Sequence, residues 1–212
     1  MTPSSPAGSP QTPDRTPDLA EILTYFHGAA LLMAGKPEGL KRLDLSADGF
    51  WTSFTAILVA APPVALSWIE FEAVEREAGL AGLASPAAAY GAHALADILA
   101  WILPIVILML AARPLGLTRK IAPLVIATNW GGALLAWALT PYWLLIFVLG
   151  NGPASEALGL AATVATILLT ARLTSTAIGR DLSVACGVVA LMIVSTLVAY
   201  GAVMDVTGIP LL

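Results

Sequence analysis

Two side chains in an apolar stretch of the sequence could do acid–base chemistry. His93 and Asp97 lie within residues 90–112, and their i, i+4 spacing places them on one face of a helix. Asp97 would lie roughly 10 Å below the end of that helix, and Asn129, about 12 Å into the next apolar segment from its opposite end, would reach a comparable depth. These three groups could form a proton or cation relay. The alternative is that Asp97 and His93 pair with each other, or with an amide, and fix helix packing.

Other kinds of site find no support in the sequence. It contains no GxSxG, GxxxxGK[ST] or HExxH motif, and no pair of aspartates arranged for intramembrane proteolysis. Its two histidines, His27 and His93, are too few and too far apart for a histidine metal site. The single Cys186 can form neither a multi-cysteine site nor an intrachain disulfide. We therefore expect no enzymatic activity, cofactor or metal, and the absence of a basic stripe with interleaved aromatics argues against a nucleic-acid partner.

The overall composition is that of a membrane protein. Of the 212 residues, 58% are hydrophobic and only 11% are charged, with a mean hydropathy of +0.85. Soluble domains carry about 25% charged residues. Long uncharged runs recur with short polar gaps between them, so the sequence predicts an all-α, polytopic bundle of transmembrane helices.

The longest uncharged run decides how many times the chain crosses the membrane. It covers Ile121 to Leu149, which as one helix would be roughly 43 Å long, more than the roughly 30 Å of a hydrocarbon core. Two crossings would need about 40 residues. We therefore expect one overlong span, with residues 142–149 either part of that span or an oblique half-helix near the boundary.

Five spans follow from this interpretation. Trp51 and Trp68 lie near the two ends of the first span, where indole rings favour the headgroup boundary, whereas Trp101 and Trp130 lie near mid-membrane and are expected to be packing residues. The transmembrane domain then covers 50–205, with spans at about 50–69, 90–112, 121–149, 155–173 and 181–204.

Prolines inside these spans predict local bends. Pro62 and Pro63 fall in the first span, Pro104 in the second and Pro141 in the third. A proline inside a helix removes a backbone donor and crowds the preceding turn, so we expect a kink at each position. The carbonyls freed by Pro62 and Pro63 need a neighbouring helix or water, so the face that carries this pair should point inward.

The part that precedes the spans divides in two. Residues 1–17 are rich in Pro, Ser and Thr and predict a disordered tail. Within 18–49, Asp18 and Glu21 resemble a capping box that opens an amphipathic helix of about 17 residues. We expect this helix to lie in the membrane interface on the cytoplasmic side, with a linker after it; the alternative is that it docks on the spans or on a partner.

The cations indicate the orientation. With five spans, nine of the ten Lys and Arg residues fall on one side, and Arg76 alone falls on the other. The nine are Arg15, Lys36, Lys41, Arg42, Arg113, Arg119, Lys120, Arg172 and Arg180. Because cytoplasmic loops carry an excess of Lys and Arg, the N-terminus should be cytoplasmic and the short tail at 206–212 external. Two crossings by residues 121–149 would reduce the split to seven against three.

This architecture resembles the Yip1-type five-span membrane proteins. The short cationic loops RPLGLTRK (113–120) and TARLTSTAIGR (170–180) are similar to those of the bacterial members, and the likeness covers about residues 50–205. The resemblance implies a non-enzymatic integral membrane protein that works through protein partners or lipid. Arg outnumbers Lys seven to three and alanine is abundant, which is typical of a GC-rich bacterial genome and indicates an inner-membrane location.

Two functions are compatible with these observations. The first is a scaffold or membrane-organising component whose partners are the lipid bilayer and a membrane protein or a second copy of the chain. The second is a small proton- or cation-coupled transporter or channel that uses Asp97, His93 and Asn129.

Overall fold

The structure, a computed structural model, describes residues 16–77, 85–150 and 152–211, and this part of the chain is helical without strands. The predicted disordered tail at 1–17 lies outside it, except for its last two residues. In chain order the elements are α1 (Leu19–Met33), the 3₁₀ turn η1 (Pro37–Arg42), α2 (Ala47–Thr52), the 3₁₀ turn η2 (Ser53–Thr55), α3 (Ala56–Glu77), α4 (Pro86–Ala111), α5 (Ile121–Leu149), α6 (Pro153–Ile178) and α7 (Leu182–Thr207).

Five helical segments are long and apolar enough to cross a membrane. The first joins α2, η2 and α3 over Ala47–Val74, and the other four are α4, α5, α6 and α7. The uncharged run is one continuous helix, α5, which ends where Gly150 adopts a φ of 74° that favours glycine. The prediction of five apolar spans, with the third formed by a single helix, is confirmed.

The first two spans extend beyond their predicted limits into the acidic segment between them. α3 continues to Glu77 instead of ending near residue 69, and α4 begins at Pro86 instead of Tyr90. Ser85 caps α4 by accepting a hydrogen bond from the Ala88 N–H at 3.3 Å. The predicted first span ended at residue 69, just before the first of these acids. Glu70 is buried, with 8% of its surface exposed.

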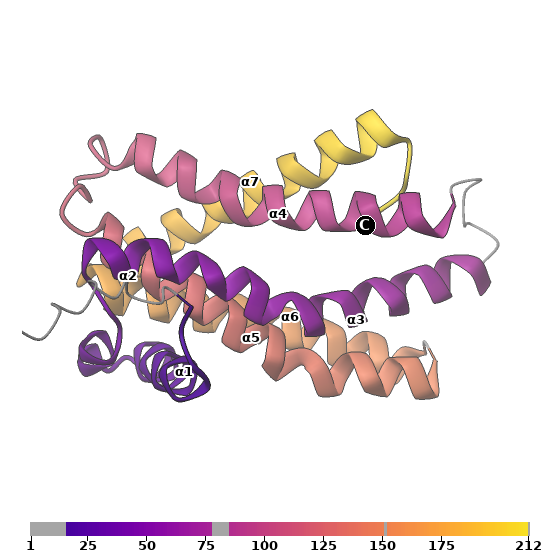
Figure 1. Ribbon diagram of the computed structural model, residues 1–212, viewed down its shortest axis with the longest axis horizontal. Coiled ribbons are helices and arrows are strands. Elements are labelled where there is room, and N and C mark those ends of the chain that lie inside the picture. Colours follow the sequence, from indigo (N-terminus) through magenta and orange to yellow (C-terminus); the bar gives the residue numbers. More distant parts are fainter. Residues whose placement is uncertain (1–15, 78–84, 151, 212) are drawn as a thin grey trace, which may run out of the picture.

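The long helices run side by side, and α1 lies across one end of them (Figure 1), where it is seen nearly end-on. α4 and α7 form one closely packed pair, and α5 packs against α3 and α6. α1 packs against α5 and α6. This crossed orientation is the one expected of an interfacial helix, and the helix also docks on the spans, as the alternative interpretation required.

The docking of α1 is built around Trp130, which is 1% exposed. Tyr25 and Phe26 of α1 bring their rings to 4.7 and 6.3 Å from the Trp130 ring, measured between centroids. The predicted capping box at the start of α1 is present: Asp18 accepts from the Glu21 N–H at 2.8 Å, and the Glu21 carboxylate accepts from the Asp18 N–H at 3.0 Å. Trp130 is therefore a packing residue, as predicted.

Donors from neighbouring helices replace hydrogen bonds that two of the prolines remove. Pro63 cannot bond to the carbonyl of Val59, four residues earlier, and that carbonyl accepts from Trp137 Nε1 of α5 at 2.9 Å. Pro104 likewise leaves the Ala100 carbonyl free, and Thr196 Oγ1 of α7 lies 3.5 Å from it. Both carbonyls therefore have a partner on a neighbouring helix; of the pair predicted to face inward, Pro63 is buried and Pro62 is exposed.

The helices continue through all four prolines. Pro62 and Pro63 lie inside α3, Pro104 inside α4 and Pro141 inside α5. Figure 1 shows α3 changing direction about midway along its length. The assignment of kinks to the individual prolines stays a prediction.

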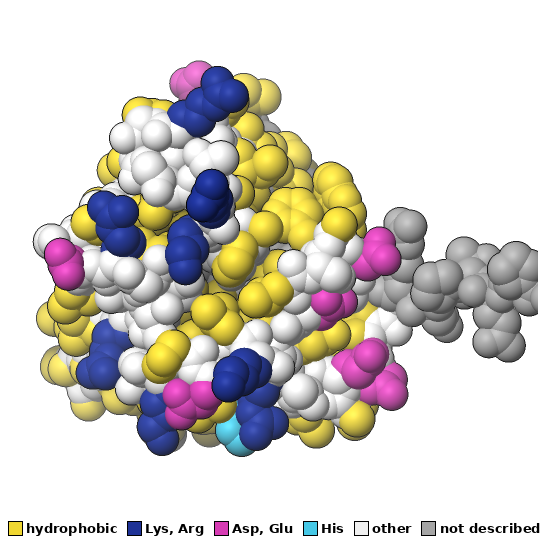
Figure 2. All heavy atoms as spheres, turned by 90° about the vertical axis from the view of Figure 1, so that its left-hand side faces the viewer, with side chains coloured by type: hydrophobic (Ala, Val, Ile, Leu, Met, Phe, Trp, Pro, Cys, Tyr) yellow, Lys and Arg dark blue, Asp and Glu magenta, His cyan; other side chains and the backbone are white. Residues whose placement is uncertain are grey.

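The end of the bundle that carries α1 also carries the cations. Figure 2 looks onto this end, where Lys and Arg side chains are spread over the surface with hydrophobic side chains between them. Arg172 of α6 reaches it and donates to the Ala34 carbonyl at 3.2 Å. By their place in the fold, the Lys and Arg residues whose side chains are described all belong to this end: Lys36, Lys41, Arg42, Arg113, Arg119, Lys120, Arg172 and Arg180.

Candidate functional site

Asp97 joins three helices. It lies eleven residues into α4, about 16 Å from the start of that helix at Pro86. Its carboxylate accepts a hydrogen bond from Trp68 Nε1 of α3 at 2.6 Å and a second, very short one from the Tyr200 hydroxyl of α7. An acceptor at this depth is costly without partners, and these two donors satisfy both of its oxygens.

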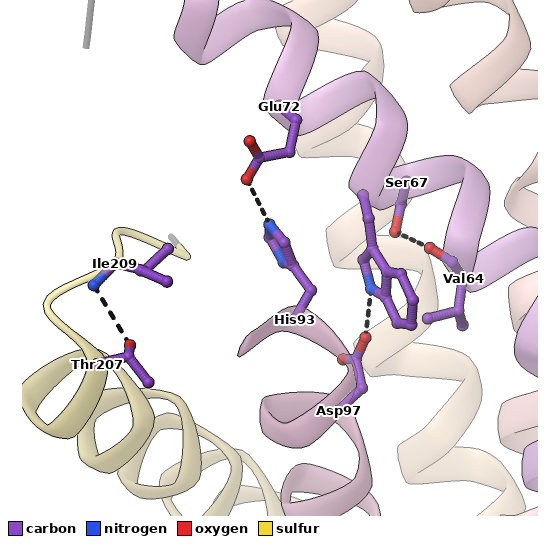
Figure 3. Close-up of polar contacts among 8 residues, drawn as sticks. Val64, Ser67, Glu72, His93, Asp97, Thr207 and Ile209 are labelled. Atoms are coloured by element: carbon purple, nitrogen blue, oxygen red, sulfur yellow. Dashed lines mark hydrogen bonds and ion pairs between the residues drawn. The ribbon is translucent and has the colours of Figure 1, made fainter. Parts of the chain in front are cut away.

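His93 lies one helical turn from Asp97 and makes a second contact between α3 and α4. Its Nε2 lies 3.3 Å from a carboxylate oxygen of Glu72, and both side chains are buried. The Trp68 ring stacks on the imidazole at 6.1 Å between centroids, and the Phe71 ring meets it edge-on at 5.3 Å. Figure 3 shows Glu72 reaching down to His93, with Asp97 below it receiving the bond from the indole.

These two contacts follow from the register of two antiparallel helices. Trp68 and Glu72 are four residues apart on α3, and His93 and Asp97 are four residues apart on α4. Because the helices run in opposite directions, Trp68 faces Asp97 while Glu72 faces His93. The two contacts therefore form successive rungs between helices that otherwise touch along little of their length.

Asn129 belongs to a separate polar contact. Its Oδ1 accepts from Trp101 Nε1 of α4 at 2.8 Å, and its Nδ2 donates to Ser53 Oγ of η2 at 2.9 Å. Ser53 in turn donates to the Phe50 carbonyl at 2.7 Å. No hydrogen bond among these described residues joins Asn129 to His93 or Asp97, or His93 to Asp97. The structure thus places His93 and Asp97 next to each other and Asn129 apart from them.

Several partners in these contacts were not expected from the sequence. Trp68 was assigned to the headgroup boundary and Trp101 to packing, yet each indole N–H donates to a polar side chain inside the bundle. Glu72 fell beyond the predicted end of the first span at residue 69, and Tyr200 carried no motif. The i, i+4 repeat of Trp68 and Glu72 opposite that of His93 and Asp97 is a signal that could have found two of them.

The chemistry open to this arrangement is acid–base chemistry. The buried Glu72 carboxylate can exchange a proton with the His93 imidazole beside it. The Asp97 carboxylate holds two donors, Trp68 and Tyr200, in fixed positions. Among the described residues no group of three or more His, Cys, Asp or Glu side chains could hold a metal ion.

Comparison with protein-family models, with curated proteins and with solved structures finds no match. The resemblance to Yip1-type proteins therefore stays an expectation that rests on architecture.

Proposed function

We propose that the protein is a non-enzymatic integral membrane protein that acts as a scaffold or organising component of a bacterial inner membrane. The observation that carries this proposal is that two polar side chains inside the spans are engaged in hydrogen bonds between helices. Asp97 and Asn129 are both held by donors from neighbouring helices, and each indole is committed to one acceptor. Such contacts fix helices relative to one another, whereas a relay needs groups that change partners during transport.

The same proposal includes an orientation in which the cationic end faces the cytoplasm. The side chains of Lys and Arg described by the structure gather at the end that also carries α1, and short loops on the cytoplasmic side are enriched in these residues. Because five spans separate the two chain ends, the N-terminus would be cytoplasmic and the C-terminus periplasmic.

Lipid and a membrane protein partner, or a second copy of the chain, are the proposed partners. α1 leaves Leu19 and Leu23 exposed at 72% and 58%, which suits contact with acyl chains at the interface. α6 likewise leaves Leu160 and Leu168 exposed at 68% and 60%. In a bilayer such faces contact lipid or another helix.

A proton-coupled transporter is the second candidate, and the contact between Glu72 and His93 favours it. A buried carboxylate and imidazole 3.3 Å apart can share one proton, and ionisable groups inside spans often mark transport paths. Glu70 is a second buried acid on the same helix as Glu72. In this reading the cluster of Glu72, His93 and Asp97 would load and release the proton.

Flux measurements with Asp97→Asn separate the two candidates. The purified protein would be reconstituted in liposomes with a pH-sensitive dye inside, and proton, sodium and potassium gradients applied in turn. We expect no flux above that of empty liposomes, and no difference between wild type, Asp97→Asn and the exposed control Asp205→Asn. A wild-type flux that Asp97→Asn abolishes while the control and the helix content are unchanged would overturn the scaffold proposal.

A further inference from the structure

The cationic end of the bundle contains a hollow of about 420 Å³ between two turns. One side is the α4–α5 turn, residues 116–120, and the other is the α6–α7 turn, residues 178–180. Three cations line it: Arg119, Lys120 and Arg180. Its volume is at the small end of ligand sites, enough for a headgroup and too small for a whole lipid.

The charges around this hollow are not balanced within the described part of the chain. None of its three cations makes an ion pair or a side-chain hydrogen bond with a described residue, and no acid lines it. Over the two turns that form it, Arg113, Arg119, Lys120 and Arg180 stand against one acid, Asp181. The segment from α1 to α2 differs, since its three cations are accompanied by four acids. The unbalanced positive charge of the end is therefore concentrated at the hollow.

The backbone of the two turns leaves the hollow accessible to an anion. Gly116 and Gly179 adopt φ values of 64° and 62°, which favour glycine, and each turn is consequently short. A Cβ at Gly179 would lie 4.0 Å from Lys120 Nζ, so this ammonium reaches across from the opposite turn. No side chain caps the start of α5, whose first N–H groups add positive potential on the same side.

The floor of the hollow is apolar. Leu117 and Ile178 are each 1% exposed and pack with Leu108, Leu124 and Val188 inside the bundle. Leu115 and Leu182, next to the lining residues in the chain, are 39% and 53% exposed. A ligand that carries both an anionic group and hydrocarbon fits this combination better than a free ion does.

We propose that this hollow binds a phosphate group supplied by the headgroup of an anionic membrane lipid. Basic pockets between transmembrane helices on the cytoplasmic side bind such headgroups through Lys and Arg. The inference deepens the proposed function by naming the lipid class, and it rests on the proposed placement of the cationic end at a membrane surface.

The test measures lipid binding by the full-length protein in detergent micelles. Dioleoylphosphatidylglycerol is titrated and bound lipid is counted by native mass spectrometry, with dioleoylphosphatidylcholine and inorganic phosphate as separate arms. We expect the anionic lipid to bind in preference to phosphatidylcholine. The triple variant Arg119→Gln/Lys120→Gln/Arg180→Gln should bind it at least about tenfold more weakly, because each cation near the surface contributes to the attraction.

Two controls separate a defined site from diffuse charge. Lys36→Gln/Lys41→Gln/Arg42→Gln removes the same net charge from exposed positions of the same end and should change binding by less than about twofold. Arg113→Gln, in the same turn but outside the hollow, should have a smaller effect than Lys120→Gln. Far-ultraviolet circular dichroism with thermal melting checks that each variant is folded.

Three results would overturn the proposal. The first is that the wild type shows no preference for the anionic lipid. The second is that the pocket and control triple variants lose lipid binding equally. The third is that inorganic phosphate binds and lipid does not, which would refute the lipid as the source of the phosphate group. The flux test varies Asp97, in the middle part of α4, whereas the lipid test varies residues of the α4–α5 and α6–α7 turns. Failure of this inference is therefore distinguishable from failure of the scaffold proposal.

Discussion

The hydrogen bond between Trp68 and Asp97 should be measurable as a coupling energy. Trp68→Phe removes the indole donor and keeps an aromatic ring beside His93, while Asp97→Leu removes the acceptor. Hydrogen bonds between side chains in membranes average about 0.6 kcal/mol and reach about 1.7 kcal/mol. The 2.6 Å separation places this bond toward the upper part of that range.

We therefore expect Trp68→Phe to lower the free energy of unfolding by about 1 kcal/mol. Asp97→Leu should cost more, because it also removes the acceptor of the Tyr200 hydroxyl. In the double variant the cost of Trp68→Phe should largely disappear, giving a coupling energy of about 1 kcal/mol.

The assay is reversible unfolding in mixed micelles of a mild detergent and sodium dodecyl sulfate, followed by circular dichroism because one substitution removes a fluorophore. Asp205→Asn, an exposed acid of α7, is the control and should be neutral. If the losses in the free energy of unfolding of the two single variants add up to that of the double variant within about 0.3 kcal/mol, the two side chains do not interact. That result would refute the antiparallel register of α3 and α4 described above.

Three further changes test other contacts. Trp137→Phe should destabilise the fold by about 1 kcal/mol in the same unfolding assay, because it leaves the carbonyl freed by Pro63 without a donor; an unchanged midpoint would contradict this. Gly131→Ala should lower the free energy of unfolding by about 1–3 kcal/mol, because the added Cβ would lie 2.5 Å from a side chain of α6. Its control is Gly201→Ala, whose Cβ would have no atom within 4 Å and which should be neutral or stabilising. Burial, and then nearby carboxylates such as Glu21, raise the pKa of Tyr25, so the folded state holds the phenol proton more tightly than the unfolded state does. This difference contributes fully to the free energy of unfolding below about pH 10 and is lost as the pH rises above it. Tyr25→Phe should therefore make the free energy of unfolding depend less on pH in that range.

The sequence was sufficient for features that depend on local rules. The length of the uncharged run at 121–149 excluded two full crossings, and α5 has those bounds. Asp18 and Glu21 form the predicted capping box because their spacing alone brings them together. The requirement that carbonyls freed by proline find a neighbour also held, although the sequence could not say that Trp137 supplies the donor.

The lateral arrangement of the helices could not be derived in this way. Asn129 and Asp97 lie at comparable depths along their helices, but depth does not say which helices are neighbours or which faces meet, and Asn129 bonds to Trp101 and Ser53 instead. Glu70 and Glu72 fell outside the predicted first span, which ended at residue 69. Tertiary contacts, including the one between Glu72 and His93, instead allow α3 to continue.

The most direct test of the account is the sidedness of the two ends of α5. In a Cys186→Ser background, single cysteines at Thr118→Cys and Ala154→Cys would be labelled with a membrane-impermeant maleimide in inverted and right-side-out vesicles. We predict that Thr118→Cys is labelled only from the cytoplasmic side and Ala154→Cys only from the other side, because α5 passes through the membrane once. Labelling of both cysteines from the same side would contradict the single passage and, with it, the five-span orientation.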